Sequence, residues 1–335
     1  MFRRGGEVKV SCEVNPSRIE FFIEPDSSSK EHNKYLSNLR NFYYSSEDIE
    51  LDPHPDKLAL VAILNLLPFV NGELEILWGI SEEMQASCKK ITKAKVHSNF
   101  DPVSPSNLHG GRPALSFSGG ADSTAALAIM PKDTECVFLL RTKNPNRTLY
   151  DSDAAEHSCR KLRLLGYKVH TIKSNFEYLR NPIGFPTDLS VGTPAILLSD
   201  SRGFDSIAFG TILESAYGTA GSRFRDYRES SHYRLWSELF GSAGIDYSVP
   251  IAGVSEVGST LICDRHPIGK VHQSCIRGKW GKPCDNCWKC FRKGSLMATI
   301  SKQSQKIDFV KQITESKEVK KKMTVASGKS LMHPV

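Results

Sequence analysis

The stretch Ser116–Leu127, which reads SFSGGADSTAAL, decides the fold of this chain. Gly119 and Gly120 separate the apolar run PALSF, at residues 113–117, from a helical pattern of small residues. Glycines allow positive φ and a close backbone approach to a ligand, and free N–H groups at a helix start favour anions. The stretch therefore predicts a strand, an anion-binding turn and a helix. Asp122 would repel a bare phosphate there, so we expect it to act through a metal ion or a hydroxyl.

The segment after this turn alternates between strands and helices. We expect strands at residues 135–140, 167–172 and 206–210, and helices at 124–130, 153–166, 194–201 and 233–243. This alternation predicts βαβ units, in which crossover helices keep the strands parallel. The expected fold class is therefore α/β, with a doubly wound parallel sheet that binds ligands at the carboxyl ends of its strands.

The first hundred residues follow a different pattern. Strands are expected at 7–14, 18–25 and 73–80, an apolar helix at 55–69, and a second helix that starts after its cap, Ser81. Residues 99–113 are rich in Pro, Gly, Ser and Asn, which is typical of a linker. The predicted organisation is a small α+β accessory domain at 1–105, a main domain at 114–300, and a basic C-terminal helix or tail at 301–335.

Composition is that of an ordinary globular protein. The chain has 335 residues, 39% of them hydrophobic, and the apolar run 58–70 is too short to span a bilayer. Its first residues lack the apolar core of a signal peptide, so we expect a cytoplasmic protein. A net charge of +7 tolerates anionic partners such as nucleotides. We interpret Lys320–Lys322 as a solvated helix face, and expect neither a nucleic-acid nor a membrane partner. A homodimer is compatible with the sequence.

Four of the nine cysteines lie within sixteen residues. The stretch 275–290, CIRGKWGKPCDNCWKC, has the spacing C-x8-C-x2-C-x2-C, formed by Cys275, Cys284, Cys287 and Cys290. Four thiolates at this spacing favour a closed, tetrahedral and therefore structural zinc site. An iron–sulfur cluster is the alternative, since CxxCxxC also occurs there.

Two motifs together carry a family resemblance. The hexapeptide SGGADS at Ser118–Ser123 resembles SGGxDS, the signature of the PP-loop ATP pyrophosphatases, which have a HUP-like fold. With the cysteine spacing downstream, residues 114–297 resemble the 7-cyano-7-deazaguanine synthase (QueC) family. SIAFGTILES at 206–215 and YSVPIAG at 247–253 match that family's later strands. The first hundred residues have no counterpart in it.

The resemblance implies the cofactors and the residues that hold them. ATP and Mg²⁺ would bind at the loop, and Zn²⁺ at the four cysteines. The ATP-binding residues implied are Ser118, Gly119, Gly120, Ala121, Asp122, Ser123 and Thr124. Asp122 and Ser123 are the implied catalytic residues.

The resemblance also implies a reaction. Family enzymes adenylate 7-carboxy-7-deazaguanine, release pyrophosphate, and convert the activated carboxylate with ammonia to an amide and then a nitrile. Relatives with extra domains act in anti-phage operons, where a protein amine can be the acceptor. We therefore expect a small deazaguanine-like carboxylate and an amine as substrates, and a protein partner for the N-terminal domain.

Two positions depart from the family pattern. Thr193–Pro194, after Gly192, stands where the family has an Arg-Asn pair after a glycine, and Glu256 stands where it has a lysine. Arginines 223, 225 and 228 either compensate or belong to a solvated loop. The candidate substrate residues are Gly210, Glu214, Arg225 and Asp226, with Glu256 as a further carboxylate. The lost cations leave a second hypothesis open, in which a degenerate PP-loop fold senses a nucleotide or docks a partner without catalysis.

Overall fold

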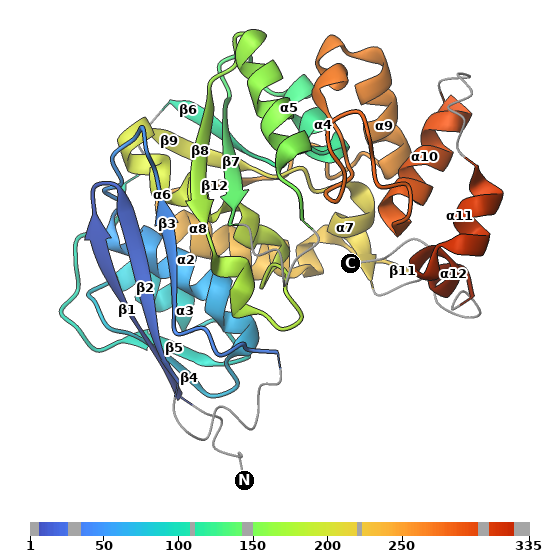
Figure 1. Cartoon of the computed structure of the whole chain (residues 1–335). Helices are drawn as coiled ribbons and strands as arrows, with labels where there is room; N and C mark the ends of the chain where they lie inside the picture. The colour runs from blue at the N-terminus through green and yellow to red at the C-terminus, as the bar shows by residue number, and fades with distance from the viewer. Residues whose placement is uncertain are drawn as a thin grey trace.

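The structure is a computed structural model that describes residues 7–25, 35–107, 111–142, 150–219, 223–300 and 308–324, with the side chains of residues 219 and 223 left out. It is a mixed α/β protein in which one large sheet is flanked by helices (Figure 1). Within the described residues, ten strands form that sheet in the order β12-β9-β6-β7-β8-β3-β2-β1-β4-β5. A separate two-stranded pair, β10 (Gly218–Thr219) and β11 (Arg223–Phe224), lies away from it.

Five parallel strands make the half of the sheet that was expected from the alternating pattern. They are β6 (Arg112–Phe117), β7 (Glu135–Arg141), β8 (Val169–Ser174), β9 (Phe204–Ala208) and β12 (Asp246–Ser248). Their helices are α4 (Ala121–Ile129), α5 (Asp153–Leu164), α6 (Thr193–Arg202), α7 (Leu213–Tyr217), α8 (Ser237–Ser242) and α9 (Glu256–Arg265). The strand order reverses between β6 and β9, the place where open parallel sheets bind ligands.

Five strands from the first hundred residues extend the same sheet. They are β1 (Glu7–Asn15), β2 (Arg18–Pro25), β3 (Asn41–Ser45), β4 (Glu73–Ile76) and β5 (Lys95–Ser98). The junction is antiparallel, with Tyr44 paired to Ser174 and Ser45 to Lys173. It is reinforced because the Ser174 hydroxyl donates to the Tyr43 carbonyl, and the Tyr43 N–H donates to Asn175 Oδ1 at 2.9 Å.

One hydrophobic core crosses the boundary predicted at residues 105–114. A single buried cluster runs from Val8 and Phe42 of the N-terminal strands to Ile207 and Ile245 of the parallel half. The predicted division into an accessory domain and a main domain therefore needs correction, because the two segments share a sheet and a core. The linker-like composition of 99–113 marks an extended connection, not the edge of an independent unit.

The helices of the N-terminal segment follow the sequence pattern. The apolar run forms α2 (Pro55–Leu66), which is buried along almost its whole length, as predicted. The Ser81 hydroxyl accepts the Met84 N–H at 3.1 Å and so caps α3 (Glu82–Cys88), also as predicted.

The C-terminal residues form helices that pack together on the side of the molecule opposite β1 and β2 (Figure 1). They are α10 (Trp288–Ile300), α11 (Phe309–Glu315) and α12 (Lys317–Thr324). The expected basic tail is thus partly a docked structure, since Glu318 of α12 pairs with Arg277 at 2.7 Å and accepts the Trp288 N–H at 3.2 Å. Residues 301–307 and 325–335 of that segment lie outside the described residues.

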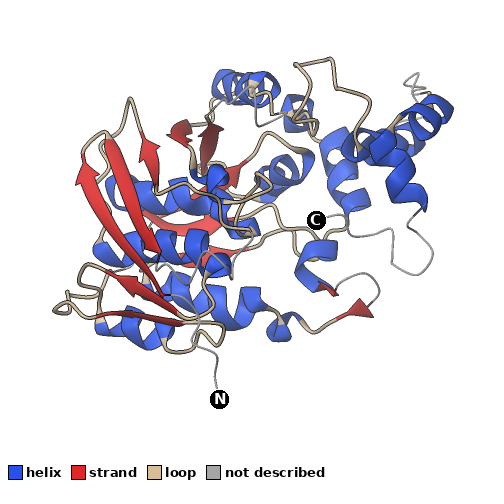
Figure 2. Ribbon diagram, turned by 60° about the horizontal axis from the view of Figure 1, so that its bottom comes forward, coloured by secondary structure: helices blue, strands red, loops and turns tan. Residues whose placement is uncertain are grey.

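The helical C-terminal part stands clear of the sheet strands in a second view (Figure 2).

No helix in the described part of the chain has the length and apolar character needed to cross a membrane.

Candidate functional site

The glycine-rich turn joins β6 to α4, as the opening motif predicted. Gly119 has a φ of 75°, which a residue with a side chain rarely adopts. A Cβ at Gly119 would also lie 3.1 Å from the Ala155 Cα on α5. Both the conformation and the close packing therefore require glycine here.

The two serines of the motif hold the turn together. The Ser123 hydroxyl accepts the Ser118 N–H at 3.2 Å, lies 3.0 Å from the Ser118 hydroxyl, and donates to the Gly120 carbonyl at 3.2 Å. These contacts occupy the hydroxyl that was expected to be catalytic. Ser123 is therefore a positioning residue in this geometry.

Thr124, the last residue of the predicted ATP-binding set, lies in the first turn of α4. Its side chain is 0% exposed, and its N–H donates to the Gly120 carbonyl at 3.1 Å within the first helical turn. The Thr124 hydroxyl has no hydrogen-bond partner among the described residues, and its role in ATP binding stays a prediction.

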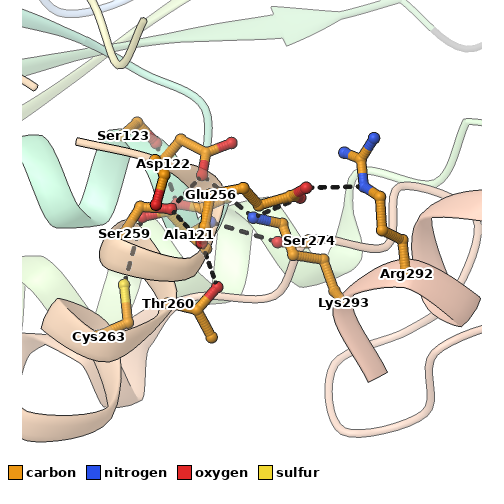
Figure 3. Close-up of polar contacts among 12 residues, drawn as sticks. Ala121, Asp122, Ser123, Glu256, Ser259, Thr260, Cys263, Ser274, Arg292 and Lys293 are labelled. Atoms are coloured by element: carbon orange, nitrogen blue, oxygen red, sulfur yellow. Dashed lines mark hydrogen bonds and ion pairs between the residues drawn. The ribbon is translucent and has the colours of Figure 1, made fainter. Parts of the chain in front are cut away.

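Asp122 lies at one end of a network of four charged side chains, in which Lys293 joins two carboxylates (Figure 3). Lys293 of α10 is only 8% exposed, and its Nζ lies 3.1 Å from Asp122 Oδ1 and 3.0 Å from Glu256 Oε1. Arg292 Nε lies 2.9 Å from Glu256 Oε2. The Ser259 hydroxyl donates to Asp122 Oδ1 at 2.8 Å. The turn, helix α9 and helix α10 thus meet at one cation.

Sequence reasoning missed Lys293 and Arg292. Their signal was a basic pair two residues after the last cysteine of the motif, but Lys293 is 171 residues from Asp122. Glu256 stands where the resembled family has a lysine. Its carboxylate forms ion pairs with both Arg292 and Lys293. A cation is therefore present beside the turn, supplied by a different element.

The other departure, Thr193, also has a structural reason. Its hydroxyl lies 2.7 Å from the hydroxyl of Tyr44, which in turn accepts a hydrogen bond from Asn65 at 2.8 Å. All three side chains are completely buried. The N-terminal segment thus fills the space beside this position with a phenol, and an arginine there would lack room and solvent.

The candidate substrate residues fall into two groups. Gly210 and Glu214 lie beside the network: a Cβ on Gly210 would be 2.7 Å from Ser123 N, and the Glu214 carboxylate accepts the Glu256 N–H at 3.1 Å. Gly210 therefore packs against the turn, and Glu214 positions the start of α9. Asp226 instead pairs with the exposed Arg228 at 2.9 Å, while the Arg225 N–H donates to the Tyr217 carbonyl. No described contact joins Arg225 or Asp226 to the network.

A pocket of ≈ 190 Å³ opens beside the turn at the carboxyl ends of β6 and β7. Its lining includes Ser118, Phe138, Arg141, Tyr150 and Lys289. The Arg141 guanidinium lies 4.0 Å above the Tyr150 ring and donates to a buried carboxylate, Glu177, at 2.7 Å. Burial raises the pKa of the Tyr150 hydroxyl, so it stays a neutral phenol. The wall is aromatic and rigid, which suits a flat ring.

The four predicted cysteines converge, and their sulfur atoms all lie within 4.8 Å of one another. The Cys284 and Cys290 sulfurs are 3.8 Å apart. Two backbone groups, the Cys284 N–H and the Cys290 N–H, point at sulfur atoms of the set, as suits thiolates. Possible hydrogen bonds from Cys287 and Cys290 hold the pKa of the Cys275 thiol below its usual range.

The spacing of the four sulfur atoms suits a tetrahedral metal site. With Zn–S bonds of about 2.3 Å, the edges of a regular tetrahedron are about 3.8 Å long. The sulfur set matches this size and could hold one metal ion. An iron–sulfur cluster places several atoms between its ligands, which needs a wider spacing.

The cysteine loop is tied directly to the glycine-rich turn. The Gln273 N–H donates to the Gly119 carbonyl at 3.0 Å, and the Ala121 N–H donates to the Ser274 hydroxyl at 3.3 Å. On the far side of the cysteines, α10 carries Lys293 back to Asp122. The segment that carries the four cysteines is thus joined to the turn on both sides of the cysteine set.

Comparisons with known proteins cover only one part of this site. A family described as "Family of unknown function (DUF6395)" matches residues 235–330, a range that includes Glu256, the four cysteines and Lys293 but not the turn. The curated proteins contain no match. Among solved structures, the U34-tRNA thiolase NcsA from Methanococcus maripaludis with its [4Fe-4S] cluster is similar, with a TM-score of 0.31 and 12% identity over 68% of this chain and 74% of that one. A score this low carries no argument about fold or function.

Proposed function

We propose that this chain is a PP-loop ATP pyrophosphatase of the QueC-like type, with a doubly wound sheet, that activates a carboxylate by adenylation. The observation that carries the proposal is the intact SGGADS turn with Asp122 joined to Lys293. A glycine-rich turn at the start of a helix suits an anion, and an acid paired with a buried ammonium suits the charge that develops when pyrophosphate leaves. A turn with only a packing role would not need a buried lysine beside it.

ATP takes the turn and the adjoining pocket in this proposal. Gly119 would present its backbone N–H to the pyrophosphate portion, while Gly120 and Ala121 would exchange long hydrogen bonds to the Ser118 and Ser274 hydroxyls, of 3.4 and 3.3 Å, for the phosphate oxygens. Ser118 and Ser123 keep the turn in shape. The aromatic pocket beside Ser118 accepts a base ring. Asp122 would hold Mg²⁺, which supplies charge neutralisation at the phosphates when bound.

Lys293 and Arg292 take over the cationic function that residues 193 and 256 lack. Both are on α10, so their position depends on the four-cysteine site next to them. We propose Zn²⁺ as the structural ion there, because it needs four thiolates at this spacing and no open coordination position. The ion would fix the cations at the turn and take no part in the reaction.

The substrate we propose is 7-carboxy-7-deazaguanine or a close relative, with ammonia or a protein amine as acceptor. Adenylation turns a poor leaving group, a carboxylate oxygen, into a good one, and the amine then displaces AMP to form an amide, a nitrile or a conjugate. Such a reaction fits a modification or anti-phage pathway in the cytoplasm. The N-terminal segment, which shares the core, would present a surface for the acceptor.

One observation favours a non-catalytic alternative, a nucleotide-sensing or partner-docking module. Asp122 Oδ1 already has two partners, Ser259 and Lys293, so the aspartate has a structural role without a metal. A chain of this kind would bind ATP and leave it intact.

The test follows ATP labelled at its α and γ phosphates. We expect AMP and pyrophosphate, with release stimulated by 7-carboxy-7-deazaguanine and not by 7-deazaguanine, which lacks the carboxylate. ADP and phosphate as the main products would contradict the PP-loop assignment. ATP that binds but is not cleaved, even with 7-carboxy-7-deazaguanine supplied, would support the non-catalytic alternative.

A further inference from the structure

A lysine of the cysteine loop lies where the aromatic pocket meets the glycine-rich turn. This residue, Lys289, lines the pocket together with Ser118 and Gly120 of the turn. It is exposed, and among the described residues its ammonium group forms neither an ion pair nor a hydrogen bond. The pocket therefore has an unpaired lysine at its junction with the turn.

Helix α10 places two lysines along the turn. Lys289 and Lys293 are four residues apart, so they share one face of the helix. The Nζ atom of Lys293 lies 3.1 Å from Asp122 Oδ1 (Figure 3). Lys289 lies one helical turn earlier on that face and lines the pocket. The two lysines are thus at different ends of the same turn.

The charges that line the pocket are not balanced. Arg141 also lines it, but its Nε donates to the carboxylate of Glu177 at 2.7 Å, and Glu177 is only 1% exposed. The other described residues of the lining, apart from Lys289, carry no charge. An unbalanced cation next to the start of a helix favours an anionic ligand at this place.

We propose that Lys289 binds the α-phosphate of ATP and stabilises it during adenylation. The inference rests on the proposed function, in which the base occupies the pocket and the pyrophosphate portion occupies the turn. The α-phosphate is bonded to the ribose on one side and to the β-phosphate on the other. It must therefore lie where the pocket and the turn meet, and Lys289 is the cation of the described lining at that junction without a partner.

The adenylation step explains why a cation is needed at this position. A carboxylate oxygen of the substrate bonds to the α-phosphorus atom, and the bond from that atom to the oxygen of the β-phosphate breaks. The electron pair of the broken bond goes to pyrophosphate, and no proton moves. The attacking carboxylate and the α-phosphate are both negative, so an ammonium group between them lowers their repulsion in the transition state. Lys289 would thus act at the attacked phosphate, and Lys293 at the leaving pyrophosphate.

The experiment measures binding to the full-length protein by calorimetry. AMP and adenosine are the two ligands, because they differ only in the phosphate that follows the ribose. The native protein is expected to bind AMP about tenfold more tightly than adenosine, as one hydrogen bond between charged groups allows. In Lys289→Met the two affinities should lie within about threefold of each other, with adenosine affinity unchanged, since the aromatic pocket is intact. Lys289→Arg keeps the charge and should keep the preference for AMP.

The matched control is Lys282→Met, which removes an exposed lysine from the same loop that does not line the pocket. Bound metal and melting temperature are measured for each variant, because Lys289 lies between Cys287 and Cys290. Lys289→Gln repeats the loss of charge with a different side chain. A native preference for AMP in both neutral variants would overturn the proposal. An equal loss of AMP and adenosine affinity, with loss of metal, would also overturn it and indicate a role in the cysteine loop.

A kinetic measurement separates this inference from the proposed function. ATP is supplied as its two α-thio diastereomers, each with sulfur in place of one non-bridging oxygen of the α-phosphate. Because an ammonium group binds oxygen better than sulfur, the native protein should prefer one diastereomer, and Lys289→Met should lose that preference while Lys282→Met retains it. A native protein that binds AMP and ATP but never releases pyrophosphate would refute the proposed function, and the binding comparison would still decide the role of Lys289. A native protein without a preference for AMP over adenosine would overturn this inference whatever its turnover.

Discussion

Replacing Lys293 by methionine tests the site most directly, because the substitution removes a charge and keeps the length of the side chain. Removing one partner of a buried ion pair costs about 3–5 kcal/mol. The cost here should be smaller, because Asp122 keeps Ser259, Glu256 keeps Arg292, and the Asp122 side chain is 32% exposed. We expect a loss of about 1–2 kcal/mol of unfolding free energy, which lowers Tm by several degrees.

The expected effect on the reaction is larger than the effect on stability. Removal of one preorganised charge from an active site costs about 10²–10³ in kcat. Pyrophosphate release by Lys293→Met should therefore fall by at least a hundredfold at temperatures where the protein is folded. Lys311→Met is the control, since Lys311 is exposed on α11 and, within the described residues, its side chain pairs only with Glu315, at 4.0 Å.

A double substitution separates the two effects. Adding Glu256→Gln to Lys293→Met restores the charge balance of the network but takes the carboxylate partner from Arg292, so stability should recover only in part while activity stays low. Pyrophosphate release within threefold of the native rate in Lys293→Met would refute the role of this cation in the reaction. The assay is calorimetry for unfolding and a coupled pyrophosphate measurement.

Four further predictions concern other parts of the molecule. Asp122→Asn should keep ATP affinity within about tenfold, or 1.4 kcal/mol, and lower pyrophosphate release at least a hundredfold; calorimetry and kinetics together decide, and native turnover would contradict it. Cys287→Ser should release the bound metal and lower Tm and activity together, and full stability of the native protein in a chelator would argue against a structural ion. Deleting residues 1–105 should give insoluble protein, because the shared core would be exposed; a folded remainder would contradict the shared core. Glu135, whose side chain is 2% exposed, should stabilise the fold most above pH 4.5. Burial alone would raise its pKa, but hydrogen bonds from His170, Lys168 and Arg202 outweigh this and lower it to about 2. Its contribution, about 3 kcal/mol, is present above the unfolded pKa and lost as pH falls from 4.5 toward 2. Acid unfolding of Glu135→Gln should lack this slope, and an unchanged slope would exclude Glu135 as its source.

Features that depend on neighbouring residues could be predicted from the sequence. The turn at Ser118–Ser123, the four cysteines, the Ser81 cap and the buried helix at Pro55–Leu66 are each encoded within a short stretch. Local conformational preference, backbone access at glycine and metal-ligand spacing act over a few residues. Such features can therefore be predicted from a single sequence.

Features that depend on distant residues required the tertiary structure. The antiparallel pairing of β3 with β8 joins two segments that look like separate units, because an unpaired strand edge accepts any strand that brings a matching apolar face. Lys293 meets Asp122 only because the cysteine loop folds back on the turn. In the sequence, Glu256 stands where the resembled family has a lysine, so a cation seemed to be missing. In the fold, the Glu256 carboxylate pairs with Lys293. The energy of a charge depends on its partner in space and not on its neighbours in the chain.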